Sequence, residues 1–218
     1  MPVNEKLQRS IVSRETMDRA KDILDKREAV FSHLTDRWLW WNRSVNLFSR
    51  NTTKVHLNYH IWHSLLLFSH FPSISQKTKT VVDAGSGGGL PGLPMAIAYP
   101  GIDFILVDKV KKKQLVLRDI ARTLSLNNVK AVHDKIENIT LPEKTCVVSK
   151  HAFDTSFLLG CLNSHSAIAV MLLKGEDVFE ELDKITLEAA FSVHVDRIDE
   201  TYSDFFKDKY IVTFRYDL

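Results

Sequence analysis

A glycine-rich segment near the middle of the chain has the composition of a ligand-binding turn. The apolar residues Val81 and Val82 lead into Asp83 and Ala84, and residues 85–94 then follow as GSGGGLPGLP. Glycines let a backbone turn tightly and approach a ligand closely. Prolines suit the first turn of a helix, and the amides of a helix N-terminus are free to bind a polar ligand. An apolar strand, a glycine turn and a helix in this order indicate a nucleotide-binding site.

A carboxylate further along the chain fits the same site. Asp108 ends the next predicted strand, 23 residues after Gly85. An acidic side chain in that position can accept hydrogen bonds from both hydroxyls of a ribose. A glycine motif alone is a weak signal. Together with this carboxylate it favours a bound nucleoside over a purely structural turn with a surface aspartate.

Two cofactors fit these residues, a dinucleotide and S-adenosylmethionine. The carboxylate of Asp83, two residues before the first glycine, suits the cationic amino group of the methionine part and would repel a pyrophosphate. The alternating glycines Gly85, Gly87 and Gly89 also resemble the methyltransferase pattern. The length leaves no room for the second catalytic domain of a dehydrogenase. The sequence therefore favours an S-adenosylmethionine-dependent methyltransferase.

The chain lacks the motifs that serve several kinds of methyl acceptor. It contains no Pro-Pro pair, which removes the Asn/Asp-Pro-Pro-aromatic loop used on exocyclic amines. Neither Cys146 nor Cys161 follows a proline, which removes the usual nucleophile for carbon 5 of cytosine. A substrate nitrogen with a free lone pair would need neither motif, because it needs only in-line placement against the sulfonium.

Basic residues are clustered after Asp108. The cluster consists of Lys109, Lys111, Lys112, Lys113, Arg118 and Arg122, and only Asp119 opposes it nearby. Beside a cofactor, such a cluster could neutralise phosphates of RNA. A solvated helix face is the alternative, and the location next to the predicted cofactor favours the first interpretation.

From about Trp38 to Gly175 the sequence resembles the RsmG (GidB) family, which methylates nitrogen 7 of a guanine in small-subunit (16S) ribosomal RNA. The glycine-proline turn at 83–94 is the most specific of the matching stretches. The others are Trp41–Leu47, His60–Leu65, Asp108 with Lys112 and Arg118, Lys135–Glu137, and Leu173–Gly175. The resemblance implies S-adenosyl-L-methionine as the methyl donor and small-subunit ribosomal RNA, or the ribosomal subunit, as the partner.

The resemblance also implies roles for particular residues. Ile136 and Glu137 would hold the adenine through backbone groups, and Lys112 and Lys135 match basic positions associated with cofactor or RNA handling. With the turn included, the predicted cofactor-binding residues are Asp83, Gly85, Ser86, Gly87, Gly89, Leu90, Asp108, Ile136, Glu137 and His151. No catalytic residue is assigned, and the candidates for positioning the substrate are Lys112, Lys135, Lys150 and His151.

One element departs from the family pattern. Its Ser-Arg-Ala-Phe-like element is Lys150-His151-Ala152-Phe153 here, so that His151 falls where a functional arginine is expected. A neutral histidine cannot replace a fixed bidentate charge. Either Lys150 substitutes through a local shift or the activity is altered. Two alternatives therefore stay open: a small-molecule methyltransferase, and a degenerate cofactor-binding protein that sits on the ribosome.

The apolar pattern predicts the elements that must position these residues. Apolar positions recur at helical spacing from about Glu15 to Phe71, and Pro72 with the polar run after it ends that pattern. Short apolar runs then alternate with helical periods, which predicts parallel crossover units. We expect an α/β, doubly wound Rossmann-like class I methyltransferase fold, with a mostly parallel seven-stranded sheet and an antiparallel edge strand. The predicted division is an N-terminal helical section at 1–75 and the cofactor-binding domain at 76–218, and the residues before Glu15 receive no assignment.

The composition and the longest apolar stretch limit the class of protein, its location and its oligomeric state. The 218 residues are 44% hydrophobic and carry a net charge of +2, which suits a globular chain and does not by itself indicate a polyanionic partner. Two isolated cysteines favour reduced thiols and a cytoplasmic protein. The most apolar stretch, Ile61–Phe71, is too short to span a membrane, and no export signal is visible. No exposed apolar stripe demands a dimer, so we expect a monomer.

Two further groups in the N-terminal section receive structural interpretations. Three tryptophans are expected to pack in the core, with base stacking as the alternative: Trp38, Trp40 and Trp41. His56, His60 and His63 have a metal-like spacing but no nearby cysteine or carboxylate on their helix, so we predict no metal site.

Overall fold

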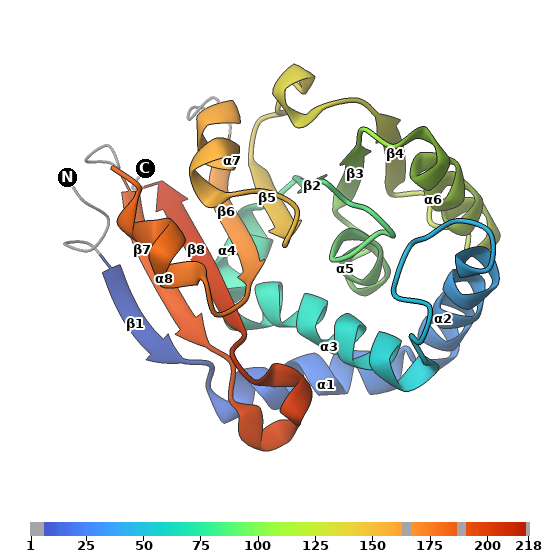
Figure 1. Cartoon of the computed structure of the whole chain (residues 1–218), viewed down its shortest axis with the longest axis horizontal. Helices are drawn as coiled ribbons and strands as arrows, with labels where there is room; N and C mark the ends of the chain where they lie inside the picture. The colour runs from blue at the N-terminus through green and yellow to red at the C-terminus, as the bar shows by residue number, and fades with distance from the viewer. Residues whose placement is uncertain (1–6, 163–166, 187–190, 217–218) are drawn as a thin grey trace.

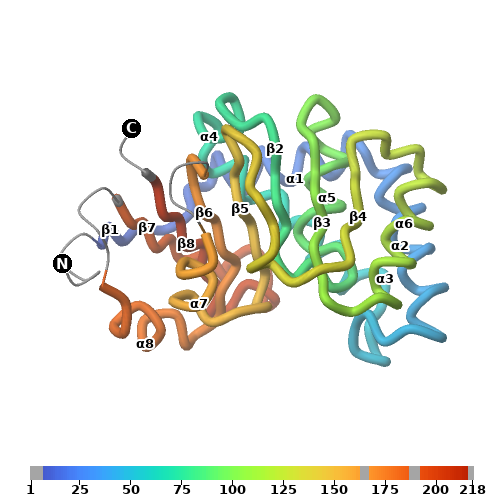
Figure 2. The backbone as a smooth tube through the Cα atoms, turned by 90° about the horizontal axis from the view of Figure 1, so that it is seen from above, coloured from blue at the N-terminus to red at the C-terminus, as the bar shows by residue number. Residues whose placement is uncertain are grey.

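The computed structural model describes residues 7–162, 167–186 and 191–216. Within these ranges eight strands form one sheet in the order β1-β7-β8-β6-β5-β2-β3-β4, and helices cover both of its faces (Figures 1 and 2). Neighbouring strands pair in parallel except at β8, which is antiparallel to both β6 and β7. The strands are β1 (Leu7–Ile11), β2 (Thr80–Ala84), β3 (Asp103–Asp108), β4 (Val129–His133), β5 (Thr145–Lys150), β6 (Ala167–Lys174), β7 (Phe191–Arg197) and β8 (Tyr210–Tyr216).

The helices of the described ranges fall into an N-terminal group and a group that alternates with the strands. They are α1 (Arg14–Lys26), α2 (Glu28–Asn42), α3 (Lys54–His70), α4 (Pro72–Lys77), α5 (Gly92–Ala98), α6 (Lys111–Thr123), α7 (Thr155–Cys161) and α8 (Val178–Asp183), with short 3-10 turns η2 (Ile136–Asn138), η3 (Glu200–Tyr202) and η4 (Asp204–Phe206). Side-chain caps begin two of the N-terminal helices. The Ser13 hydroxyl accepts a hydrogen bond from the Thr16 N–H in α1, and the Thr53 hydroxyl accepts one from the His56 N–H in α3.

Both faces of the sheet are buried, which explains why β2 is apolar along most of its length. Successive side chains of a strand point to opposite faces. Val81 packs in a core cluster with residues of α1, α2, α3, α5 and α6, whereas Val82 packs in a second cluster with residues of α7 and α8. A parallel strand covered on both sides needs apolar residues at most positions. Asp83 is therefore an exception within the strand.

The predicted fold class is confirmed, and two details of the sheet differ. Within the described ranges the sheet has eight strands rather than seven, because Leu7–Ile11 in the unassigned segment pairs in parallel with β7. The sequence LQRSI shows no apolar alternation and is mostly exposed, so backbone pairing and a hydrogen bond from Ser10 to Asp196 hold it rather than apolar burial. The last two strands pair antiparallel as predicted, but β8 lies between β6 and β7 and not at the edge.

The N-terminal section shares its core with the sheet. The helices α1 and α3 lie side by side across one face (Figure 1). The helix α3 ends at His70, as predicted, and Pro72 begins the short helix α4, so that the expected boundary between residues 75 and 76 falls inside α4. No helix in the described ranges has the length and apolar character needed to cross a membrane.

Candidate functional site

The glycine turn connects the C-terminal end of β2 to α5. Gly85 has a φ of 68°, and a Cβ at this position would lie 2.5 Å from the Cβ of Ala152, so that only glycine fits. Several hydrogen bonds hold the turn, among them Gly87 N–H to Asp108 Oδ2 (2.9 Å), Gly92 N–H to Asp83 Oδ2 (2.8 Å), and Trp38 Nε1–H to the carbonyl of Gly88 (2.7 Å). The turn is therefore fixed both by the sheet and by the N-terminal helix α2.

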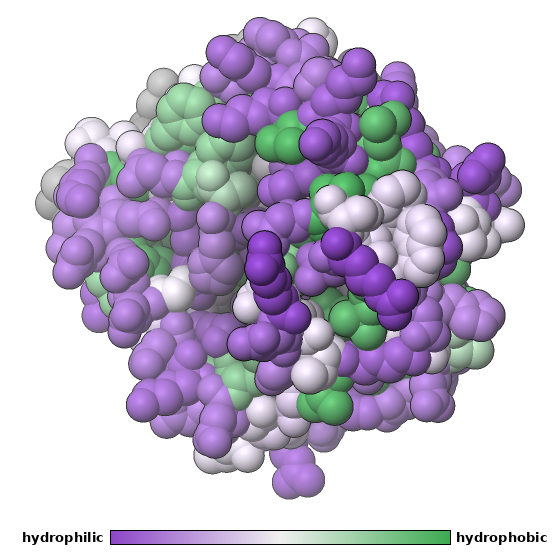
Figure 3. Space-filling model, turned by 45° about the vertical axis from the view of Figure 1, so that its right-hand side comes forward, coloured by the Kyte–Doolittle hydropathy of each residue, from purple (hydrophilic) through white to green (hydrophobic). Residues whose placement is uncertain are grey.

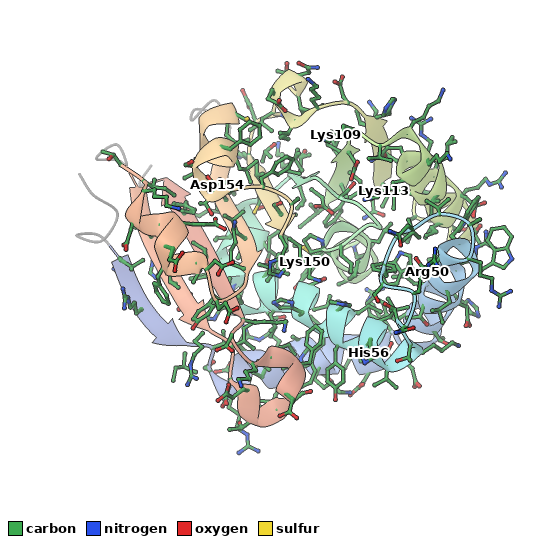
Figure 4. All side chains as sticks on the ribbon, viewed as in Figure 1. Arg50, His56, Lys109, Lys113, Lys150 and Asp154 are labelled. Atoms are coloured by element: carbon green, nitrogen blue, oxygen red, sulfur yellow. The ribbon has the colours of Figure 1, made fainter. Side chains whose placement is uncertain are left out.

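A cavity of about 610 Å³ opens beside this turn. Four segments supply most of its wall, 85–88, 107–110, 134–137 and 150–153, and they lie at the C-terminal ends of β2, β3, β4 and β5. Ligands of open α/β sheets bind at this edge. The rest of the wall comes from Leu47, Phe48, His60, Leu90, Lys113 and Phe157. Lys109, Lys113 and Lys150 lie around the cavity (Figure 4).

Asp108 lies in the cavity wall at the end of β3, with only 9% of the residue exposed. Its Oδ2 accepts a hydrogen bond from the Gly87 N–H at 2.9 Å, and its Oδ1 accepts one from the Val110 N–H at 2.8 Å. A carboxylate oxygen has two acceptor sites, so each oxygen keeps one for a ligand. This arrangement suits the two hydroxyls of a ribose.

Asp83 was expected to touch the ligand, but the structure places it beneath the turn and outside the cavity wall. Strand alternation points its side chain toward α5, where Oδ2 accepts the Gly92 N–H and Oδ1 has no hydrogen-bond partner. Burial raises the pKa of Asp83 to about 7, against the hydrogen bond from Gly92. Gly89 also lies outside the wall, packed against Leu93 and Leu117.

The raised pKa of Asp83 predicts a pH-dependent stability. The folded carboxyl holds its proton up to about pH 7, whereas the unfolded one loses it near its ordinary value of 3.8. The free energy of unfolding should therefore fall as pH rises between these values. Asp83→Asn removes this titration. In urea unfolding, the free energy of unfolding of the wild type should therefore fall relative to that of the variant by up to about 4 kcal/mol from pH 4 to pH 7.5. An unaltered slope with pH for Asp83→Asn would contradict the burial argument.

Lys150 ends β5 and brings an ammonium group to the cavity wall. Its Nζ lies 2.8 Å from Nδ1 of His60 on α3. Burial and the adjacent Lys150 lower the pKa of His60 to about 3, so this ring is neutral and accepts the hydrogen bond. Burial and Lys209 lower the pKa of Lys150 to about 8, while Asp83 acts in the opposite direction. The ammonium group therefore has one fixed partner and further N–H donors for a ligand.

The other histidines singled out in the sequence lie in three different environments. His151 lines the cavity next to Lys150 with a φ of 49°. The His63 ring is fully buried against Phe205 and Phe206 without a hydrogen-bond partner. His56 takes part in the cap of α3. Within the described ranges no group of three or more His, Cys, Asp or Glu residues could hold a metal ion.

The cavity brings together most, but not all, of the residues singled out in the sequence. Those in its wall are Gly85, Ser86, Gly87, Leu90, Asp108, Lys135, Ile136, Glu137, Lys150 and His151. Lys112 is exposed on α6 and lies outside the wall, and its neighbour Lys113 lines the cavity instead. Adjacent residues on a helix point in different directions, so a cluster of lysines cannot show which one faces a site.

Sequence reasoning missed several residues of the wall. Leu47 and His60 lie in stretches that resemble the family, but nothing local to them indicates that they line the cavity. Phe48 and Phe157 carry no signal in the sequence. These four come from the loop after α2, from α3 and from α7, and only the tertiary fold brings them to the ends of the strands.

Comparisons with known proteins agree with this arrangement. Residues 27–203 match the family described as GidB, rRNA small subunit methyltransferase G. A ribosomal RNA small subunit methyltransferase G of Chlorobium luteolum is 34% identical over 180 residues, which cover 79% of this chain and 74% of that protein. One from Flavobacterium psychrophilum is 28% identical and covers 91% of this chain and 93% of its own. A solved methyltransferase from Geobacter sulfurreducens shares the fold, with a TM-score of 0.57 at 12% identity over 84% of this chain and 89% of that one.

Proposed function

The chain belongs to the GidB family, rRNA small subunit methyltransferase G, and from this premise we propose that it transfers a methyl group from S-adenosylmethionine to nitrogen 7 of a guanine in 16S ribosomal RNA. The single observation that carries the choice of acceptor is the Lys150 ammonium group held by His60 in the cavity wall.

The residues of the cavity fit S-adenosylmethionine. Asp108 has acceptor sites left for the ribose hydroxyls, and Ile136 and Glu137 on the next wall segment would hold the adenine. Gly85 lines the cavity with backbone alone, next to the space that the methionine part would occupy, and Asp83 lies buried beneath the turn, where its carboxyl keeps its proton up to about pH 7. When bound, S-adenosylmethionine supplies a methyl group activated on a sulfonium.

The N–H donors of Lys150 in the cavity wall favour a base that presents two acceptors on one edge. Guanine presents nitrogen 7 and oxygen 6 side by side, whereas adenine presents nitrogen 7 beside an amino donor. The Lys150 ammonium group donates only, so it would bind guanine oxygen 6 and repel the amino group of adenine. A guanine held in this way has nitrogen 7 free to attack.

The methyl transfer needs no proton acceptor in the cavity. Nitrogen 7 has a free lone pair, its bond to the methyl carbon forms as the carbon–sulfur bond breaks, and the positive charge passes from sulfur to the base. The contribution of the chain is orientation, with Lys150 and His151 positioning the base and Asp108 the donor. Backbone carbonyls near the base can stabilise the charge that it acquires.

We further propose that the N-terminal section at 1–75 contributes to substrate docking, that residues 76–218 hold the methyl donor, and that the protein acts as a monomer in the cytoplasm. The section already reaches the cavity through Leu47, Phe48 and His60.

The decisive experiment maps 7-methylguanosine in small-subunit rRNA of cells that lack this gene. The modification should disappear, return with the wild-type gene, and stay absent with a gene that encodes Lys150→Met. Unchanged methylation in the deletion strain would refute the proposed function. A protein that restores no methylation but still binds S-adenosylmethionine would favour the degenerate ribosome-associated alternative.

A further inference from the structure

A second hollow lies at the end of α2 and the loop that follows it. Its volume is about 510 Å³, and the loop 43–53 with the end of α2 forms its walls. We call it the loop hollow. Its lining is polar apart from Leu39, and the charged residues that line it are Arg43 and Arg50. The loop 43–53 contains no aspartate or glutamate. The hollow is therefore positive, without a carboxylate in its wall to balance the charge.

The two guanidinium groups are free of protein partners. In the described part of the chain, the side chains of Arg43 and Arg50 form no ion pair or hydrogen bond. By contrast, Arg37 and Arg122 on the adjacent helices both pair with Asp119. An unpaired guanidinium keeps its planar set of N–H donors, which match two oxygens of a phosphate.

Hydrogen bonds and ring packing hold the loop that carries these arginines. The Asn42 side-chain oxygen accepts hydrogen bonds from the N–H groups of Leu47 and Phe48, both at 2.9 Å. The Phe48 ring packs edge-on against Trp38, with ring centroids 5.4 Å apart. Trp38 in turn donates to the glycine turn through Gly88. The loop is thus fixed to the same turn that bounds the methyl-transfer cavity.

The loop contributes different residues to the two sites. Leu47 and Phe48 line the methyl-transfer cavity, while Arg43 and Arg50 line the loop hollow. Arg50 lies on the loop between α2 and α3 (Figure 4). Figure 3 shows a face of the molecule on which hydrophilic residues predominate, with apolar residues between them. Leu47 and Phe48 of this loop line the methyl-transfer cavity, so a strand whose base enters that cavity would lie next to the loop.

We propose that the loop hollow binds the phosphodiester backbone of the rRNA next to the target guanosine, through Arg43 and Arg50. This inference rests on the proposed function for the identity of the polyanion. The hollow contributes to the affinity for RNA and not to the affinity for S-adenosylmethionine, because its arginines do not line the methyl-transfer cavity.

The test compares two double variants that remove the same charge. Arg43→Gln with Arg50→Gln changes the hollow, and Lys77→Gln with Lys79→Gln changes two exposed lysines before β2, at the opposite end of the strands. The measurements are the Kd for in vitro transcribed 16S rRNA at several salt concentrations, the Kd for S-adenosylmethionine, and the KM and kcat for methylation.

The arginine variant should bind the rRNA at least about tenfold more weakly at 0.15 M salt. The slope of log K for rRNA binding against log salt concentration should become shallower by about 0.7–0.9 for each phosphate contact removed. Its kcat and its Kd for S-adenosylmethionine should stay within about twofold of wild type, as should all values of the lysine variant. Equal weakening in both variants, or none in the arginine variant, would overturn the inference. A wild-type protein that binds rRNA through these arginines but does not methylate it would refute the proposed function and leave the docking surface standing.

Discussion

Lys150→Met should lower kcat for methylation of rRNA about a hundredfold or more. The variant keeps the length of the side chain and loses its charge and its N–H donors, so His60 loses its partner and the base loses the donor to oxygen 6. Misplacement of nitrogen 7 by about 1 Å is enough for an effect of this size. The Kd for S-adenosylmethionine should change little, because Asp108 and the turn at 85–88 remain.

Single-turnover methylation of 16S rRNA and calorimetric titration with S-adenosylmethionine measure the two effects separately. Lys150→Arg restores a charged donor at the same position and should recover at least a tenth of the wild-type rate. The matched change Lys79→Met, at the far end of β2, should leave both measurements as in wild type. A Lys150→Met protein with a normal rate would exclude Lys150 from positioning the base, and an equal loss in S-adenosylmethionine affinity would place it in the donor site instead.

The turn and Asp108 could be predicted from the sequence because their signals are local. A buried strand, glycines and a helix start follow one another within a dozen residues, and Asp108 ends the adjacent strand. Asp83 shows the limit of such reasoning. Its position before the turn is visible in the sequence, but the direction of its side chain depends on the pleat of β2 and on the packing of α5, and both place it under the turn.

The pairing of Lys150 with His60 lay beyond the sequence for another reason. The two residues are 90 positions apart, and neither belongs to a short motif that states the contact. The departure from the family pattern drew attention to both Lys150 and His151, and the structure brings both to the cavity wall and adds the contact between Lys150 and His60. The strand β1 could not be predicted either, because its sequence has no apolar alternation. Its place at the edge of the sheet depends on backbone pairing with a strand more than 180 residues away.

Gly85→Ala should weaken binding of S-adenosylmethionine about a hundredfold. The added Cβ would lie 2.5 Å from the Cβ of Ala152 and 2.9 Å from the Phe153 ring, and alanine disfavours a φ of 68°. Overpacking of this kind costs about 1–3 kcal/mol, and the backbone conformation adds about 1–2 kcal/mol. Either the turn or the segment 150–153 must move to relieve the contact. Both form the wall of the cavity, so the ligand site changes in either case.

Two companion variants separate the contact from the backbone conformation. Gly87→Ala also has a positive φ, 54°, but its Cβ would meet nothing closer than 3.8 Å, so binding should weaken less than about tenfold. Gly101→Ala would meet no atom within 4 Å and should bind as wild type does. Calorimetric Kd values in the order Gly85→Ala, Gly87→Ala, Gly101→Ala, from weakest to tightest, are the expected result. If Gly85→Ala and Gly101→Ala bind equally well while both remain folded by circular dichroism, the turn does not form the donor site.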